Sequence, residues 1–220
     1  MGTHFTALVN HNLDEGDVYN LPDLLNSIWP NVEQFLPVIE GYPAPGRAPG
    51  KWQWSKRDCV FSEKLRANET AMLVGNEFDG WASKYIFSLT HVAKWSWFLE
   101  DQQVRSKLRN VCSHVASALG SNQIVYVPSG FLKPEGVRSL MYEGKTVEEM
   151  IDWLYQNCGQ PAQSFESIEP EDLAKLLLHR PTLPFRSWGL TSGADCTENG
   201  PQLAQVPNLR DSTSGLDSSY

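Results

Sequence analysis

An amphipathic segment, residues 102–119, constrains the fold of this chain more than any other feature. Its apolar residues recur at three- and four-residue spacing, which places them on one side of a helix. Asp101 stands at the N-cap position, and Gly120 stands where a helix commonly ends. Such a helix has to bury its apolar stripe against another layer. The stripe consists of Val104, Leu108, Val111, Cys112, Val115 and Leu119.

Short strand-like segments lie before and after this helix. Residues 5–9, 71–74 and 124–127 are apolar runs of strand length, and they predict buried strands. Asp79-Gly80 is a turn signal. Residues 81–98 fit both a strand and a helical stripe, and their aromatic content favours a strand.

Four further helices are indicated by the sequence. Asn20 and Pro22 suit the start of a helix that ends at Pro30, and residues 31–39 form a second short helix. Thr146 to Glu149 is a capping box, which opens a helix that runs to residue 158. Residues 170–180 carry the pattern of a last helix.

These elements predict an α+β fold, with a small mixed or antiparallel sheet packed against two to three helices. Residues 1–180 are expected to form a single domain, whose aromatic and leucine side chains condense into one dry interior. From about Gly189 the chain is rich in Gly, Ser, Thr and Asp without a period. Residues 181–220 are therefore expected to be a loosely ordered tail.

Composition narrows the class of protein and its compartment. The first 30 residues contain no Lys or Arg, and no apolar run is long enough for a signal peptide or a membrane span. The four cysteines form no C-x-x-C pair, so no cofactor or metal is predicted from them. We expect a cytoplasmic protein with reduced thiols that does not contact membranes. Its oligomeric state stays open.

The charge is acidic overall and unevenly distributed. The net charge of −8 makes nucleic acid an improbable partner, although residues 47–66 hold six basic against two acidic residues. Residues 143–172 hold eight acidic residues against one lysine. Four of these acids lie in expected first helical turns, where they complement the helix dipole. The other four, Glu143, Asp152, Glu166 and Glu169, predict a negative surface for a basic protein partner.

Two tryptophan pairs, Trp52/Trp54 and Trp95/Trp97, have i, i+2 spacing. On strands, the members of each pair project from the same face. They could form an aromatic surface that binds a partner or stacks a sugar, or they could fill the core. Both interpretations stay open.

Part of the chain resembles a scattered set of uncharacterised bacterial proteins. The resemblance covers residues 95–172, with a Trp-Ser-Trp-Phe-Leu start, a Val-Tyr-Val-Pro strand at 125–128 and a Cys-Gly-Gln-Pro motif at 158–161. A Ser-Ile-Glu-Pro motif at 167–170 completes it. The resemblance implies a bacterial, cytoplasmic protein and brings no activity or catalytic residue.

The sequence contains few groups of residues with the spacing of a catalytic site. His4 and His11, seven residues apart, face opposite ways on an unbroken strand, and Cys112 and His114 point apart on a helix. We expect His91 to be a core histidine with one satisfied ring nitrogen.

The leading hypothesis is a non-catalytic protein-binding protein, with an immunity-type role as one form of it. The first alternative is an enzyme of unrecognised class that uses His11, His91 or the Glu77/Asp79 pair. The second is a small-ligand or sugar binder that uses the tryptophans.

Overall fold

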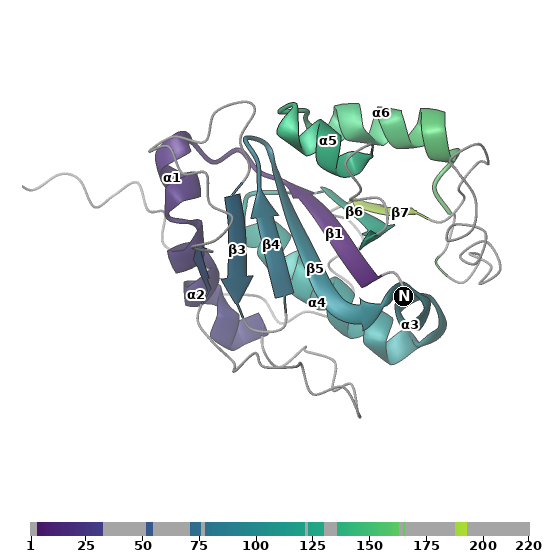
Figure 1. Cartoon of the computed structure of the whole chain (residues 1–220). Helices are drawn as coiled ribbons and strands as arrows, with labels where there is room; N and C mark the ends of the chain where they lie inside the picture. The colour runs from purple at the N-terminus through teal and green to yellow at the C-terminus, as the bar shows by residue number, and fades with distance from the viewer. Residues whose placement is uncertain are drawn as a thin grey trace, which may run out of the picture.

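An antiparallel sheet with helices on both faces organises the chain (Figure 1). The computed structural model describes residues 4–32, 52–54, 71–75, 78–121, 123–129, 136–162, 165 and 188–192. In these residues seven strands pair in the order β2-β3-β4-β5-β1-β6-β7, and every pairing is antiparallel. The predicted α+β class is confirmed. The strands are β1 (His4–Asn10), β2 (Gln53–Trp54), β3 (Ala71–Gly75), β4 (Phe78–Ala82), β5 (Ile86–Lys94), β6 (Gln123–Pro128) and β7 (Gly189–Ser192).

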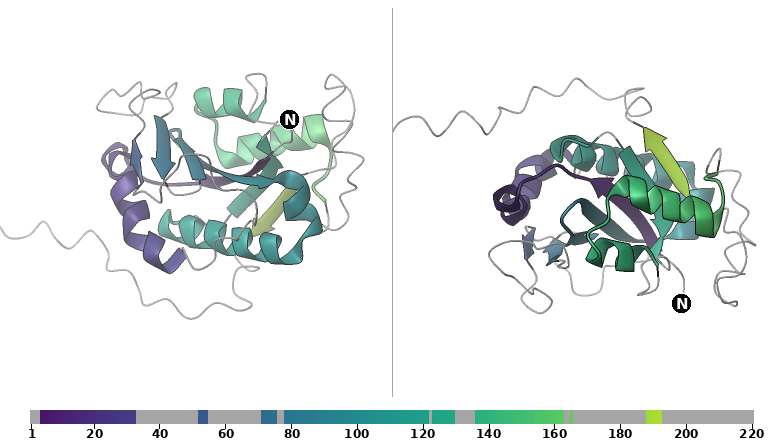
Figure 2. Two further views of the ribbon diagram at one scale, coloured as in Figure 1. Left: turned by 60° about the horizontal axis from the view of Figure 1, so that its bottom comes forward. Right: turned by 90° about the horizontal axis from the view of Figure 1, so that it is seen from above.

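The helices divide between the two faces of the sheet (Figure 2). Helices α2, α3 and α4 pack against one face, in a cluster that we call the α4-side core. Helices α5 and α6 pack against the other face, in the α6-side core. The helices are α1 (Glu15–Tyr19), α2 (Leu21–Val32), α3 (Trp95–Glu100), α4 (Gln102–Ala118), α5 (Val137–Tyr142) and α6 (Val147–Cys158).

Strand β1 lies in the middle of the sheet and contributes to both cores. Phe5, Ala7 and Val9 belong to the α4-side core, whereas Leu8 belongs to the α6-side core. This follows from the two-residue period of a strand, which turns alternate side chains to opposite faces. The expectation of a single dry interior is therefore wrong, because the sheet separates two apolar clusters.

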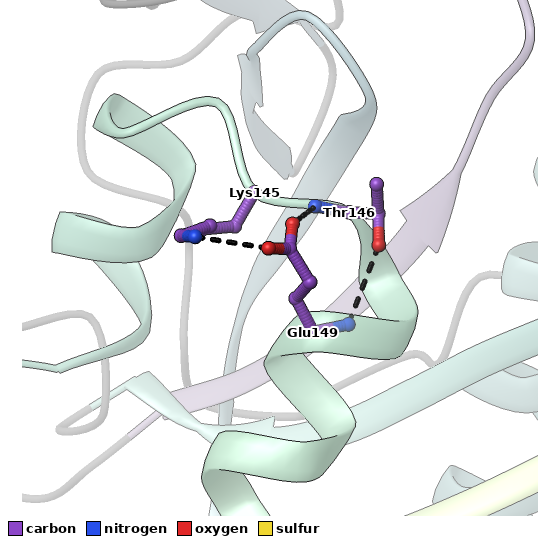
Figure 3. Close-up of polar contacts among 3 residues, drawn as sticks. All are labelled: Lys145, Thr146 and Glu149. Carbon is purple, nitrogen blue, oxygen red and sulfur yellow. Dashed lines mark hydrogen bonds and ion pairs between the residues drawn. The ribbon is translucent and has the colours of Figure 1, made fainter.

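The end signals of α4 and α6 are confirmed. Asp101 Oδ1 accepts hydrogen bonds from the backbone N–H groups of Gln103 (2.8 Å) and Val104 (3.1 Å), and Gly120 has a φ of 70° just after α4. Thr146 and Glu149 form the reciprocal capping box of α6 (Figure 3). Each cap satisfies backbone donors that have no partner inside the helix.

The ambiguous segment 81–98 divides into two kinds of structure. A strand was predicted throughout, and β5 bears this out from Ile86 to Lys94. The chain then turns directly into α3 at Trp95, so the strand prediction is wrong for residues 95–98. In α3, Trp95, Phe98 and Leu99 are buried, which is the three- and four-residue spacing of a helix.

Two local signals misled the prediction. Helix α2 does not end at Pro30 but continues to Val32, since Trp29 and Val32 are both buried and hold its last turn against the α4-side core. Asp79 and Gly80 form no turn and lie inside β4. A Cβ atom at Gly80 would stand 2.7 Å from Phe87 Cε2, so this glycine permits close packing across the β4–β5 pair.

Residues 188–192 were expected to belong to the tail, and instead they complete the sheet. Trp188 is buried, and its Nε1 donates to the Gly159 carbonyl at 3.1 Å. The Ala162 N–H donates to the Trp188 carbonyl at 2.9 Å, and β7 then pairs with β6. The rest of the expected tail and the helix expected at 170–180 lie outside the described residues. Of the short helix expected at 31–39, residues 31 and 32 instead continue α2, and residues 33–39 lie outside the described residues.

No helix in the described ranges has the length and apolar character needed to cross a membrane.

Candidate interaction surface

The tryptophans that the sequence singled out do not form one exposed platform. Trp52 and Trp95 are buried in the α4-side core, with exposed fractions of 2% and 0%. Trp97 is partly buried, and Lys94 Nζ lies 5.2 Å from its ring centroid. The Trp54 side chain lies outside the described part of the structure.

The reason for this difference lies in the local structure. Trp95 and Trp97 stand on α3, where two residues correspond to a rotation of roughly 200°, so they do not share a face. Trp52 packs against Trp29, with ring centroids 5.4 Å apart, and the Asn26 side chain binds its backbone. A surface role is therefore wrong for Trp52 and Trp95, which fill the core.

The two histidines of the enzyme hypothesis lie apart. His91 pairs with Phe5 near one end of the β1–β5 ladder, and the His11 N–H donates to Tyr85 O beyond the other end. Positions 5 and 11 are six residues apart along the chain, which corresponds to about 20 Å at 3.3 Å per residue. The two rings do not converge on one site.

Each of these histidines is also engaged by backbone groups. His11 is buried, and its Nε2 lies 2.9 Å from the Ser83 carbonyl, which can only accept, so Nε2 carries the proton. Burial lowers the pKa of His11, and the bond to Ser83 opposes this effect in part. His91 is fully buried, and its Nδ1 accepts the Ala93 N–H at 3.0 Å, which confirms the expected core histidine.

The other catalytic and metal candidates do not assemble either. His4 is exposed whereas His11 is buried. Asp79 faces the α6 side of the sheet from inside β4, and Glu77 lies outside the described residues. Within the described ranges, no three His, Cys, Asp or Glu side chains come together as metal ligands.

Several acidic and aromatic side chains of α5, of α6 and of the turn between them are exposed. Glu143 and Asp152 are exposed, as the sequence predicts, while Glu166 and Glu169 lie outside the described residues. Tyr142 and Tyr155 are the most exposed aromatic side chains of this layer, at 38% and 37%. We call this the α5–α6 surface, and it consists of Tyr142, Glu143, Glu148, Asp152 and Tyr155.

The geometry of α6 aligns three of these side chains. Glu148, Asp152 and Tyr155 follow each other at i, i+4 and i+7, which is one stripe of a helix. Glu149 points to a different partner, because its carboxylate binds Lys145 Nζ at 2.9 Å (Figure 3). Glu149 and, more weakly, Glu143 raise the pKa of Lys145. Lys145, the one lysine among residues 143–172, therefore interacts with Glu149 and Glu143.

A cluster that the sequence analysis missed adjoins this surface. The Arg138 guanidinium of α5 lies over the Trp81 ring of β4, 4.4 Å from its centroid, and 5.6 Å from the Tyr142 ring centroid. Arg138 Nη2 also donates to Tyr142 Oη at 3.2 Å. We call these three residues the Arg138 cluster. The Arg-x-x-x-Tyr spacing was a usable signal, since residues four apart meet on a helix, but nothing local connects Arg138 with Trp81.

The hairpin between β4 and β5 repeats this combination of a cation and a ring. Lys84 Nζ lies 5.0 Å from the Tyr85 ring centroid. Trp81 and Tyr85 are both partly buried against the α6-side core. Both hairpin rings are thus anchored in the core and keep one side near solvent.

Comparison with known proteins adds no assignment: no protein-family model, no curated protein and no solved structure matches this chain. The resemblance of residues 95–172 to uncharacterised bacterial proteins stays an expectation.

Proposed function

We propose that this chain is a cytoplasmic, non-catalytic protein-binding protein whose α5–α6 surface contacts a basic protein partner. The observation that carries the proposal is the stripe of Glu148, Asp152 and the exposed Tyr155 along one side of α6. Tyrosine, tryptophan and arginine are the residues most often found at the energetic centres of protein interfaces. The Arg138 cluster, which shares Tyr142 with the α5–α6 surface, supplies all three types.

The acidic net charge of the chain favours a partner of positive charge. The chain carries 26 acidic against 18 basic residues. Complementary charge steers two proteins together and suppresses partners of the same sign. An immunity-type role, in which an acidic protein neutralises a basic toxin, is consistent with this chemistry and rests on analogy.

The test has two stages. A tagged full-length chain is incubated with bacterial cytoplasmic extract at low and at high ionic strength, and proteins released by salt are identified by mass spectrometry. A candidate is then purified, and its affinity is measured by calorimetry. We expect the affinity to fall with added salt, since exposed charges are screened within about 10 Å at 0.1 M.

Variants of the α5–α6 surface decide whether the measured binding uses it. We expect Tyr155→Ala and Asp152→Asn each to weaken the affinity by about tenfold or more, which corresponds to about 1.4 kcal/mol. Glu100→Gln is the matched control, since Glu100 is an exposed acid at the end of α3. Equal affinities for all three variants and the unchanged chain would contradict the proposal, as would the absence of any salt-released basic protein.

A further inference from the structure

The Arg138 guanidinium is held in a fixed orientation by two aromatic rings. It lies 4.4 Å from the Trp81 ring centroid and 5.6 Å from that of Tyr142. Trp81 is fixed in turn, because it stands within β4 and packs against the α6-side core. An arginine stacked on rings keeps its planar fork of N–H donors pre-organised, so it loses little freedom on binding a further group.

Most of the donors of this guanidinium are left for a ligand. Arginine has five N–H donors. One of them reaches Tyr142 Oη, at 3.2 Å. Within the described part of the chain, no carboxylate lies at ion-pair distance from Arg138, and Tyr142 Oη is its one hydrogen-bond acceptor. Arg138 is partly exposed, so the remaining donors are within reach of solvent.

Among the described residues, Arg138 thus has no carboxylate partner, although the full chain has a net charge of −8. The Glu149 carboxylate, eleven residues after Arg138, binds Lys145 Nζ and the Thr146 N–H instead. Glu143, next to Tyr142 in the sequence, does not reach the guanidinium. The described acids closest to Arg138 in sequence therefore leave its guanidinium without a carboxylate partner.

We propose that the Arg138 cluster is a binding site for an oxyanion, the carboxylate or phosphate group of a ligand. The planar fork of arginine matches both groups in geometry, and charge-assisted bidentate bonds to them are among the strongest in proteins. The site contains none of the three stripe residues of α6, although it shares Tyr142 with the α5–α6 surface. Its test uses small oxyanions and does not require the proposed binding of a basic protein.

The test uses two simple oxyanions as probes. The full-length chain, labelled with ¹⁵N, is titrated with sodium acetate and, separately, with sodium phosphate, and sodium chloride provides matched ionic strength. The Nε–Hε signal of Arg138 and the indole N–H signal of Trp81 are followed by NMR. We expect both signals to shift in a saturable way with an oxyanion and to stay in place with chloride. Tighter binding of acetate assigns the natural group as a carboxylate, and tighter binding of phosphate assigns it as a phosphate.

Variants show whether the probe binds specifically at Arg138 or is attracted to positive charge in general. Arg138→Lys keeps the charge but loses the planar fork, and we expect it to weaken binding of the better probe by about tenfold or more. Arg109 is the matched control, because it also lies over a ring, at 5.8 Å from the Phe165 centroid, but on the α4 side of the sheet. Its Nε–Hε signal should not respond.

Two results would overturn the proposal. One is a Trp81 or Arg138 shift that grows linearly with probe, or that chloride reproduces. The other is an Arg138→Lys variant, shown by circular dichroism to be folded, that binds the probe as tightly as the unchanged chain. Neither result bears on the α6 stripe, whose variants are measured with a protein partner.

Discussion

Two hydrogen bonds from a single amide side chain connect α2 with the edge of the sheet. Asn26 Nδ2 donates to the Trp52 carbonyl at 3.0 Å, and the Trp52 N–H donates to Asn26 Oδ1 at 2.7 Å. The side chain thus pairs with the Trp52 backbone as a neighbouring strand would. It also holds the Trp52 ring in place against Trp29. We therefore predict that removing this amide destabilises the whole fold.

The size of the effect follows from the two hydrogen bonds. Each contributes about 0.5–1.5 kcal/mol net, so Asn26→Ala should lower the free energy of unfolding by about 2 kcal/mol. For a chain of this length, that corresponds to a midpoint lower by about 4–8 °C. Asn26→Asp should be at least as damaging, because it loses the donor and sets a carboxylate oxygen against the Trp52 carbonyl.

Thermal and urea unfolding, followed by circular dichroism and tryptophan fluorescence, measure these changes. Ser27→Ala is the matched control one residue along α2. Ser27 is exposed, and its hydroxyl binds the Leu24 carbonyl of the same helix. Its free energy of unfolding should change by no more than about 0.5 kcal/mol. An Asn26→Ala variant that unfolds at the same midpoint as Ser27→Ala would refute the structural reasoning.

Two further predictions concern buried titratable groups. Burial lowers the pKa of His11 below 6.5, so the unfolded chain binds more protons there, and stability should fall as the pH drops below about 6.5. In His11→Gln, the urea midpoint should fall less between pH 7.5 and 5.5 than in the unchanged chain, and an equal fall would contradict this assignment. Burial raises the pKa of the Cys158 thiol to about 12, so iodoacetamide at pH 8 should leave it unmodified in the folded chain and alkylate it in urea. Peptide mapping by mass spectrometry measures the difference, and equal rates in both conditions would show that the thiol is accessible.

The elements that could be predicted are those whose signals are local. Helix α4 carries its cap, its apolar period and its terminal glycine within twenty consecutive positions, roughly the span over which helical patterns are reliable. The capping box of α6 is equally self-contained. By contrast, the boundary at Trp95 was not readable, because the aromatic residues there satisfy both a strand and a helix.

The parts that escaped prediction depend on contacts between distant segments. Gly80 resembles a turn residue in sequence, and only the Phe87 ring across the ladder explains its place in β4. Strand β7 has the polar composition of a loop, and its pairing with β6 gives it strand structure. The Arg138 cluster joins β4 to α5. The sequence left both a surface and a core role open for the tryptophans, because burial of an indole is decided by the fold and not by spacing.

The position of β1 also has a consequence for how the chain is made. Residues 4–10 leave the ribosome well before their two neighbours in the sheet, because β5 and β6 end only at residues 94 and 128. Until β5 and β6 have been synthesised, the apolar residues of β1 lack both neighbouring strands. Such long-range pairing slows folding, and the partly folded intermediates that expose apolar surface are prone to aggregate. The newborn chain should thus be a client of chaperones that hold extended apolar segments until synthesis has passed β6.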